Sequence, residues 1–316
     1  MYKNVGILGA GSWGTALANI LAGNGINVTL WSRNIEVVSS INNNNINSKY
    51  FPNLVLAPNI YATSNITEAL NSEILFLVIP TQHIIKILQE YKDSLHTPLV
   101  ICNKGIDTEK LLFPSQYIKN ITNNKFAILS GPNFAVEIIN QLPAATIIAS
   151  SNNDLASQVA KALSNDFFKC YTTDDVIGVE ICGSMKNVLA IACGICQGKE
   201  LGENAKSYLI TKGIEEIKLL VEYLGGDSKT IFSVAGIGDI ILTCNSILSR
   251  NLNFGIRLAK KQITLKEQTV EGFYTAKAIN LITKDLNLKL PIMDAIYKII
   301  HENYDIDLCI AELLKN

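Results

Sequence analysis

Short apolar runs separated by stretches of helical period dominate the first half of the chain. The runs are continuous rather than alternating with polar residues, which is typical of parallel strands buried on both faces. Amphipathic helical patterns lie between several of them, for example at residues 83–91 and 155–163. We therefore predict a parallel sheet covered by helices on both faces, in a domain spanning residues 1–178. The apolar runs lie at 5–8, 27–31, 60–63, 74–79, 99–102, 126–130 and 145–149.

The second half of the chain has a different pattern. After about residue 178 nearly all apolar positions recur with helical spacing, without an internal repeat or a flexible linker. The first helix of this part, at about 179–196, has an apolar stripe and a stripe of small residues. Small side chains let another backbone or a ligand come close. The pattern predicts an all-helical domain over residues 179–316.

A glycine-rich turn follows the first predicted strand. Gly9, Gly11 and Gly14 have the spacing Gly-x-Gly-x-x-Gly, and a small-residue helix follows at 15–21. In a dinucleotide site these glycines allow a sharp turn, a close approach to the pyrophosphate and tight packing of helix on strand. The helix start also offers unpaired N–H groups and the positive end of its dipole. This arrangement predicts a Rossmann-type dinucleotide site, with a purely structural turn as the alternative.

The end of the second strand indicates which dinucleotide the site accepts. In such folds the adenosine ribose lies about 20 residues after the glycine turn, where Asp or Glu favours the 2′-hydroxyl of NAD. This chain instead has Ser32 and Arg33. We therefore expect NADP or NAD as cofactor, since a 2′-phosphate is tolerated, and Arg33 as a solvated surface residue is the alternative.

Three later strands end in turns with small or polar residues, namely Pro80-Thr81, Asn103-Lys104-Gly105 and Gly131-Pro132-Asn133. Ligands in open α/β sheets bind beyond the carboxyl ends of the strands, so we expect these turns to meet at one crevice. Lys104 is a cation at such a strand end. We expect it to contact a ligand rather than to be an ordinary surface lysine.

Lys186 lies beside the small-residue stripe of the helix predicted at 179–196. A lysine and the neighbouring Asn187 are costly to bury among such residues unless they are used. We expect Lys186 to be functional, and a lysine that merely reaches solvent is the alternative. Further along, a glycine loop at 235–238 delivers Asp239 to the start of an apolar helix.

Ser249 has the character of a helix N-cap, which places Arg250 and Asn251 on the first turn of an amphipathic helix at 252–260. A helix N-terminus and a guanidinium together match a phosphate group in charge and in hydrogen-bond geometry. We expect a phosphate site here. The alternative is an exposed, capped helix with a solvated arginine.

The amino-acid composition limits the partners, the cellular location and the metal sites that we expect for the protein. The chain has 316 residues, of which 48% are hydrophobic and 17% charged, and a formal net charge of −1, which gives no general attraction to nucleic acid or anionic membrane. The longest apolar run, at 74–80, is too short to span a bilayer, and the start of the chain lacks a signal-peptide layout. Seven cysteines, an odd number, fit reduced thiols and a cytoplasmic location. We expect Cys193 and Cys196 to pack in the core, and we expect no metal site because the three histidines are widely separated.

Several motifs occur together in an order that resembles one family. They extend over almost the whole chain, and a set of ordered motifs is far more specific than any single one. The sequence resembles the bacterial type of NAD(P)-dependent glycerol-3-phosphate dehydrogenase. The motifs are GAGSWGTALA at 9–18, NKGI at 103–106, GPNFAVE at 131–137, GSMKNV at 183–188, GIGDIILTC at 236–244, SRN at 249–251 and VEG at 270–272.

The resemblance implies a Rossmann-type domain followed by an all-helical domain, as in 6-phosphogluconate dehydrogenase. It implies reversible reduction of dihydroxyacetone phosphate to sn-glycerol 3-phosphate, a precursor of glycerophospholipids. The implied partners are this small phosphorylated substrate and a second copy of the chain in a homodimer, without nucleic acid or a membrane span.

The resemblance also implies roles for individual residues. Lys186 is the implied general acid/base, held by Asp239, and Arg250 and Asn251 are the implied phosphate anchor. The implied substrate contacts are Lys104, Gly131, Asn133, Lys186, Asp239, Ser249, Arg250 and Asn251. The implied cofactor contacts are Gly9, Gly11, Ser12, Trp13, Gly14, Arg33, Tyr50, Lys104, Ala135, Arg250 and Glu271.

The chain departs from the family pattern at Asn133, where Ser or Thr is usual, at Leu142-Pro143 and at Lys212, where Arg is common. Two other functions remain open. One is a related dehydrogenase of the same two-domain plan that acts on a 3-hydroxy acid or on 6-phosphogluconate. The other is a nucleotide-binding sensor without turnover. The presence of a lysine, an aspartate and an arginine together argues against this sensor.

Overall fold

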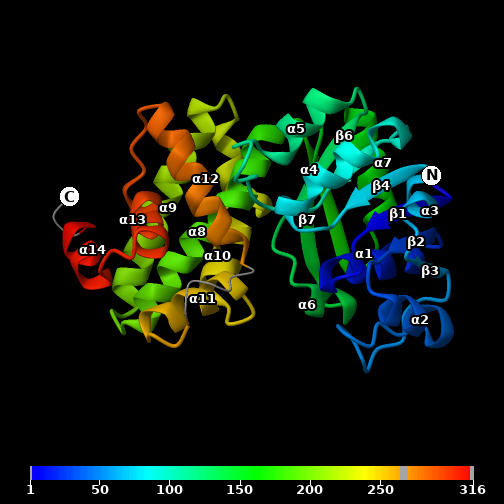
Figure 1. Ribbon diagram of the computed structural model, residues 1–316, viewed down its shortest axis with the longest axis horizontal. Coiled ribbons are helices and arrows are strands. Elements are labelled where there is room, and N and C mark those ends of the chain that lie inside the picture. Colours follow the sequence, from blue (N-terminus) through cyan, green and yellow to red (C-terminus); the bar gives the residue numbers. More distant parts are fainter. Residues whose placement is uncertain (1, 264–269, 314–316) are drawn as a thin grey trace. The chain divides into compact units, whose positions relative to one another are not determined.

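The computed structural model describes residues 2–263 and 270–313, which form two compact units. Among these residues, the first unit comprises 2–103 and 114–176, and the second comprises 104–113, 177–263 and 270–313. Figure 1 labels most of the elements of both units. The segment 104–113 therefore belongs by its contacts to the second unit, although it follows a strand of the first.

One eight-stranded sheet forms the centre of the first unit, with the strand order β3-β2-β1-β4-β5-β6-β7-β8. Neighbouring strands are parallel except for β6 and β7, which are antiparallel. The strands are β1 (Asn4–Leu8), β2 (Asn27–Trp31), β3 (Ile60–Thr63), β4 (Ile74–Leu77), β5 (Leu99–Ile101), β6 (Phe126–Ser130), β7 (Ala144–Ala149) and β8 (Phe168–Thr173).

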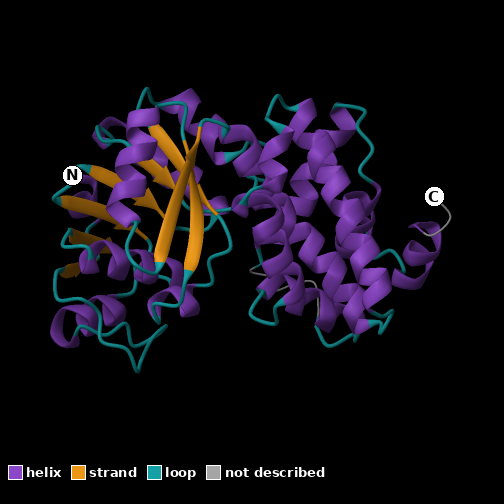
Figure 2. Cartoon of the chain, turned by 180° about the vertical axis from the view of Figure 1, so that it is seen from behind, coloured by secondary structure: helices purple, strands orange, loops and turns teal. Residues whose placement is uncertain are grey.

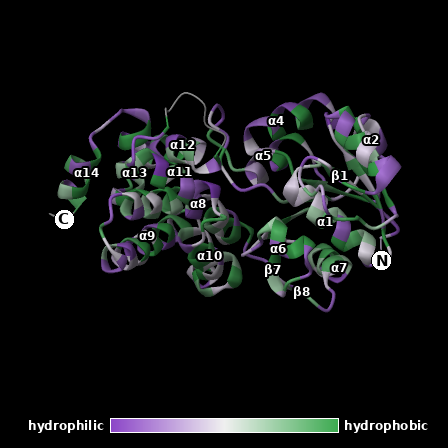
Figure 3. Cartoon of the chain, turned by 90° about the horizontal axis from the view of Figure 1, so that it is seen from below, coloured by the Kyte–Doolittle hydropathy of each residue, from purple (hydrophilic) through white to green (hydrophobic). Residues whose placement is uncertain are grey.

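The helices of the first unit connect the strands and complete its core. Side chains of the sheet pack with those of α1 and α7 in one apolar cluster, because these helices present their buried faces to it. In Figure 3 hydrophilic and hydrophobic residues share the same helices, as expected for amphipathic helices on a sheet. The helices are α1 (Ser12–Gly23), α2 (Ile35–Asn44), α3 (Ile66–Leu70), α4 (Thr81–Glu90), α5 (Pro114–Ile121), α6 (Ala135–Ile139) and α7 (Asn153–Leu163), with a 3₁₀ turn at Lys92–Ser94.

The sheet confirms the seven predicted strands and corrects the prediction in two places. Strand β7 runs antiparallel to β6, whereas we expected a wholly parallel sheet. Strand β8 was not predicted, because it lies at the sheet edge, where its mixed exposed and buried residues break the continuous apolar pattern. A buried run shows that a strand exists but carries no information about its direction.

Every regular element of the second unit among the described residues is a helix or a helical turn, and Figure 2 shows its helices in purple. Helix α8 (Val176–Gly198) is long and apolar enough to cross a bilayer. However, 94% of its apolar 18-residue stretch is buried inside the protein, as in the core helix of a folded domain. Its other elements are α9 (Glu203–Tyr223), α10 (Asp239–Asn245), α11 (Arg250–Ala259), α12 (Glu271–Asp285), α13 (Pro291–His301) and α14 (Ile306–Leu313), with short helical turns at Ser228–Phe232 and Val234–Gly238.

Helices α8 and α11 pack backbone against backbone. A Cβ atom added at Gly194 would lie 2.1 Å from the carbonyl oxygen of Leu252, and one added at Gly255 would lie 2.2 Å from that of Ile191. Both distances are far below van der Waals contact, so only glycine fits at either position. The predicted small-residue stripe of α8 is thus used by another backbone, which holds the start of α11 close to the middle of α8.

Candidate active site

The glycine turn of the first unit has the geometry that the sequence predicts. Gly9 has φ +117°, a conformation that a side chain disfavours. A Cβ atom at Gly14 would lie 1.8 Å from the carbonyl oxygen of Gly9, so Gly14 allows α1 to pack on the strand end. A Cβ atom at Gly11 would meet nothing within 4 Å. The backbone is therefore open to a ligand at the glycine expected to face the pyrophosphate.

The start of α1 suits an anion. Its N-cap is Gly11, which provides no side-chain hydrogen bond, and its first turn contains no acidic residue. The first N–H groups of a helix lack intrahelical partners, and here no side-chain cap competes for them. Ser12 and Trp13, both predicted cofactor contacts, form this first turn and are partly exposed. These residues fit the pyrophosphate of a dinucleotide.

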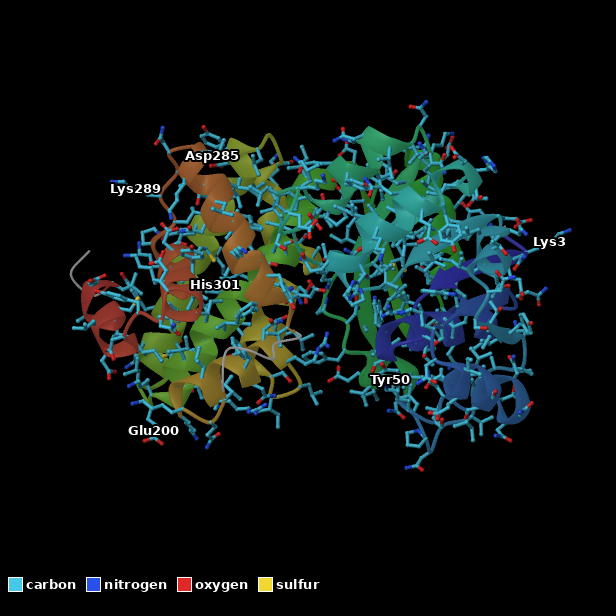
Figure 4. All side chains as sticks on the ribbon, in the orientation of Figure 1. Lys3, Tyr50, Glu200, Asp285, Lys289 and His301 are labelled. Atoms are coloured by element: carbon cyan, nitrogen blue, oxygen red, sulfur yellow. The ribbon has the colours of Figure 1, made fainter. Side chains whose placement is uncertain are left out.

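The other predicted cofactor contacts of the first unit lie at strand or helix ends. Arg33 follows β2 and is exposed, while the buried hydroxyl of Ser32 accepts the N–H of Asn34 at 3.2 Å. Tyr50 is 41% exposed and lies on the outside of the first unit (Figure 4), with the ammonium of Lys49 5.7 Å from its ring centre. Ala135 is the first residue of α6. Both Arg33 and Tyr50 are exposed, so both side chains are accessible to a cofactor.

The carboxyl ends of β4, β5 and β6 lie at one edge of the sheet, because these strands are parallel neighbours. The turns after β4 and β5 meet, since Asn103 donates a hydrogen bond from Nδ2 to Oγ1 of Thr81 at 2.8 Å. After β6, Gly131 is buried against the backbone of β7. Asn133 donates from Nδ2 to the carbonyl oxygen of Ala145 at 3.1 Å, so its amide is held by its own unit.

A carboxylate with a lysine on each oxygen lies in the second unit. The ammonium of Lys186 lies 2.6 Å from Oδ1 of Asp239, and that of Lys104 lies 2.7 Å from Oδ2. The Asp239 side chain is 1% exposed, and those of Lys186 and Lys104 are 9% and 20% exposed. The three residues come from α8, the start of α10 and the segment after β5. The structure therefore joins three predicted site residues in one ion-pair cluster.

Burial is the main influence on the acidity of Lys186. Desolvation lowers the pKa of its ammonium to about 8, with Lys104 adding to that decrease and Asp239 opposing it. A buried cation without a countercharge would lose its proton far more readily. Lys186 is thus poised to hold a proton at neutral pH and to release it at modest cost, as a general acid requires.

Thr243 is a member of this cluster to which the sequence analysis gave no role. Its Oγ1 accepts a hydrogen bond from Lys186 Nζ at 2.8 Å and donates one to the carbonyl oxygen of Asp239 at 2.6 Å. It lies four residues after Asp239, which places both side chains on the same face of α10. This four-residue spacing is the feature of the sequence from which a role of Thr243 could have been inferred. Two of the three N–H bonds of the Lys186 ammonium are therefore committed, one to Asp239 and one to Thr243.

A chain of amide hydrogen bonds leads from α8 to the starts of α11 and α12. Asn251 Nδ2 donates to Oδ1 of Asn187 at 3.0 Å, and Asn251 Oδ1 accepts the N–H of Gly272 at 3.0 Å. A Cβ atom at Gly272 would lie 2.6 Å from the carbonyl oxygen of Asn187, so the approach requires glycine. Glu271, a predicted cofactor contact, is the first residue of α12 and is placed by this approach.

Ser249 is the N-cap of α11, as predicted, and its Oγ accepts the N–H of Leu252 at 3.2 Å. Arg250 follows on the first turn with its side chain exposed, while Ser249 and Asn251 are buried. An exposed guanidinium on the first turn of a helix suits an anion that approaches from solvent. Asn251 couples this turn to Asn187, the neighbour of Lys186 in the chain.

The described side chains also bear on whether the protein could hold a metal ion. Over residues 2–263 and 270–313, no group of three or more histidine, cysteine, aspartate and glutamate side chains is placed to hold one. The carboxylate of Asp239 already faces two ammonium groups, which would repel a cation. Cys193 and Cys196 are both buried in α8.

The Rossmann-type sheet, the open glycine turn and the buried lysine on a carboxylate together define an NAD(P)-dependent dehydrogenase of the two-domain class. Models of one family match the chain over most of its length. The N-terminal part of NAD-dependent glycerol-3-phosphate dehydrogenase matches residues 4–156, and the C-terminal part matches residues 175–311. The chain belongs to the NAD-dependent glycerol-3-phosphate dehydrogenase family.

Individual relatives agree with the family models. The chain is 40% identical to glycerol-3-phosphate dehydrogenase [NAD(P)+] of Ehrlichia chaffeensis, over 98% of this chain and 99% of the relative. It is 38% identical to the enzyme of the same name from Corynebacterium diphtheriae, over 98% and 97%. The crystal structure of glycerol-3-phosphate dehydrogenase from Coxiella burnetii superimposes with a TM-score of 0.93 at 32% identity, covering 100% of this chain and 99% of that one.

Proposed function

We propose that the protein catalyses the reversible NAD(P)H-dependent reduction of dihydroxyacetone phosphate to sn-glycerol 3-phosphate, and that it supplies glycerophospholipid synthesis. The observation that carries this proposal is the buried ammonium of Lys186 on the carboxylate of Asp239. Family membership supports the cofactor and the substrate. The open backbone at Gly11 and the uncapped start of α1 support the binding of the dinucleotide.

A nicotinamide dinucleotide held at the glycine turn would supply the hydride for the carbonyl carbon of the substrate. Negative charge then develops on the carbonyl oxygen, where a positioned ammonium is most effective because its partner charge appears only in the transition state. Lys186 has one N–H bond that no acceptor takes among the described residues. We assign this bond to the substrate oxygen, which Lys186 stabilises and then protonates. Asp239 keeps the amine charged, and Thr243 fixes its direction.

We assign the substrate phosphate to the start of α11. Arg250 offers a guanidinium, and the first turn offers backbone N–H groups. Asn251 is held by Asn187 and Gly272, so the anchor is fixed relative to Lys186. A fixed anchor holds the carbonyl in position for hydride transfer and lowers the entropic cost of the reaction. Lys104, Ser249, Gly131 and Asn133 complete the proposed substrate contacts.

For the cofactor we assign Gly9, Gly11 and Gly14 with Ser12 and Trp13 to the pyrophosphate. The remaining proposed contacts are Arg33, Tyr50, Lys104, Ala135, Arg250 and Glu271. In this assignment residues 1–178 form the dinucleotide-binding domain and residues 179–316 form the substrate-binding and catalytic domain.

We also propose that the protein is a cytoplasmic homodimer. All seven cysteines carry thiols rather than disulfides, which suits a reducing compartment. Size-exclusion chromatography with light scattering tests the dimer, and a monomer at micromolar concentration would contradict it.

The central test replaces Lys186 by methionine, which has a similar volume and no charge. We expect kcat for dihydroxyacetone phosphate to fall by about 10²–10⁴-fold, because the general acid is lost, while the Kd of NADPH stays within about twofold. The measurement is the loss of NADPH absorbance, combined with a fluorescence titration of NADPH. Lys206→Met is a matched control, since Lys206 is also a buried lysine with a carboxylate partner, Glu203 at 3.0 Å. Near-wild-type kcat in Lys186→Met would refute the assignment. A substrate panel with 3-hydroxy acids and 6-phosphogluconate tests the choice of substrate separately.

A further inference from the structure

Asn47 is a fully buried residue with no role in the assignments above. It begins a turn at residues 47–51, after α2. Its Nδ2 donates hydrogen bonds to the carbonyl oxygen of Ala10 at 3.1 Å and to Oγ1 of Thr15 at 2.8 Å. Its Oδ1 is buried and has no hydrogen-bond partner among the described residues. An unpaired buried acceptor is unfavourable, so a favourable contribution of this side chain can come only from the two hydrogen bonds that it donates.

The bond to Ala10 fixes the orientation of one peptide group in the glycine turn. The carbonyl of Ala10 and the N–H of Gly11 belong to the same planar trans peptide, so they point in opposite directions. When Asn47 holds the Ala10 oxygen on one side, the Gly11 N–H must point to the other side. A glycine peptide without such a bond rotates easily, because glycine has few forbidden backbone angles.

The bond to Thr15 fixes the other end of the same segment. The N–H of Thr15 donates to the carbonyl oxygen of Gly11 at 2.9 Å, which is the first hydrogen bond of α1. Asn47 thus holds residues on both sides of Gly11, the position where a Cβ atom would meet open space. The helix start and the peptide before it are held in one arrangement.

The backbone of Asn47 organises a second segment. Its carbonyl oxygen accepts the N–H of Tyr50 at 3.2 Å and that of Phe51 at 2.8 Å. These bonds shape the turn that carries Tyr50, which we assigned to the cofactor. One residue therefore links the glycine turn to the Tyr50 turn, although the two segments lie more than 30 residues apart in sequence.

We propose that Asn47 is a positioning residue of the dinucleotide site. It sets the direction of the Gly11 N–H and the place of Tyr50 before the cofactor arrives. A donor held in its binding geometry needs no reorganisation on binding, so Asn47 lowers the Kd of the dinucleotide without touching it. This inference rests on the proposed function only in that the glycine turn holds the dinucleotide.

The experiment compares Asn47→Ala with Asn59→Ala. Asn59 is a matched control in the same unit, because its Nδ2 also donates two hydrogen bonds, to the carbonyl oxygens of Ala22 at 3.1 Å and Ile26 at 2.7 Å, at the opposite end of α1. We expect both variants to lose thermal stability. Only Asn47→Ala should raise the Kd and KM of NADPH, by roughly five- to thirtyfold as for two lost hydrogen bonds. The kcat at saturating NADPH and the KM of dihydroxyacetone phosphate should stay within about twofold.

A residue with a purely structural role would behave like Asn59. An unchanged Kd of NADPH in Asn47→Ala, or an equal rise in Asn59→Ala, would therefore overturn the proposal. If Asn47→Ala does not fold, Thr15→Val replaces it, because valine keeps the shape of Thr15 and removes one acceptor. That variant should raise the Kd of NADPH by about three- to tenfold, and no change would overturn the proposal. Wild-type protein that does not bind NADPH would instead refute the proposed function.

Discussion

The glycine turn of the first unit consists mainly of backbone groups, whereas the lysine cluster of the second unit consists of charged side chains. The turn offers an anion backbone N–H groups and open space, and its glycines are required by backbone geometry. The cluster offers side chains whose charges depend on one another, and burial lowers the pKa of Lys186 to about 8. Backbone donors do not titrate near neutral pH, whereas an amine does. Binding of the cofactor and transfer of the proton should therefore respond differently to the same perturbation.

Removing the shared charge should have the largest effect. In Asp239→Asn the two ammonium groups lose the carboxylate that they share, so the pKa of Lys186 falls further and less of the amine is protonated at pH 7. We expect kcat to fall by about 10²–10³-fold, with the Kd of NADPH within about twofold. Steady-state kinetics and a fluorescence titration give both values. Asp307→Asn is the control, since it removes an exposed ion pair with Lys199. Equal losses of NADPH binding and of kcat would show that the two regions are not separable.

An added methyl group in the glycine turn should have the opposite pattern. Gly11→Ala should fold with an unchanged melting temperature, because its Cβ atom meets nothing within 4 Å. The methyl group would occupy space assigned to the pyrophosphate, so we expect the Kd of NADPH to rise by about ten- to hundredfold. Gly23→Ala is a control in the same helix with equally open space. A Kd of NADPH that is unchanged in Gly11→Ala would place the pyrophosphate elsewhere.

A change of pH should have the smallest effect, and it should affect the lysine cluster but not the glycine turn. Lys186 must be protonated to act as an acid, and its pKa is lowered to about 8. The kcat/KM for reduction reports the groups of the free enzyme, so it should be constant below pH 7 and fall about tenfold per pH unit above pH 8. Oxidation of glycerol 3-phosphate needs the neutral amine, so its kcat/KM should rise over the same range. The Kd of NADPH should change little between pH 7 and pH 9. A kcat/KM for reduction that rises above pH 8 would exclude Lys186 as the acid.

Much of the fold could be predicted because buried strands appear in the sequence as continuous apolar runs. The seven continuous apolar runs are all strands, and Ser249 caps α11 as its neighbours suggested. The antiparallel direction of β7 and the edge strand β8 could not be predicted, since apolar runs have no direction and edge residues are mixed. Their placement depends on tertiary contacts.

The site shows the same division. Lys186 was conspicuous as a lysine among small and apolar residues, and its ion pair with Asp239 joins residues 53 apart in sequence. The second ion pair joins Lys104 to Asp239 over 135 residues, a distance at which sequence spacing is uninformative. Asn47 gave no signal at all, because an asparagine in a polar segment is indistinguishable from a solvated one until its burial is known. Sequence therefore identified reactive groups better than the residues that hold them.

The three side chains of the cluster, two lysines and one carboxylate, sum to a formal charge of +1. The chain as a whole has a formal net charge of −1, so this excess is local. An anionic reactant is drawn toward such a charge over roughly a Debye length, about 10 Å at 0.1 M salt. We expect capture of the phosphorylated ketone to slow as ionic strength increases. The same attraction retains the anionic alcohol, so we expect the dissociation of the product to become faster as ionic strength increases.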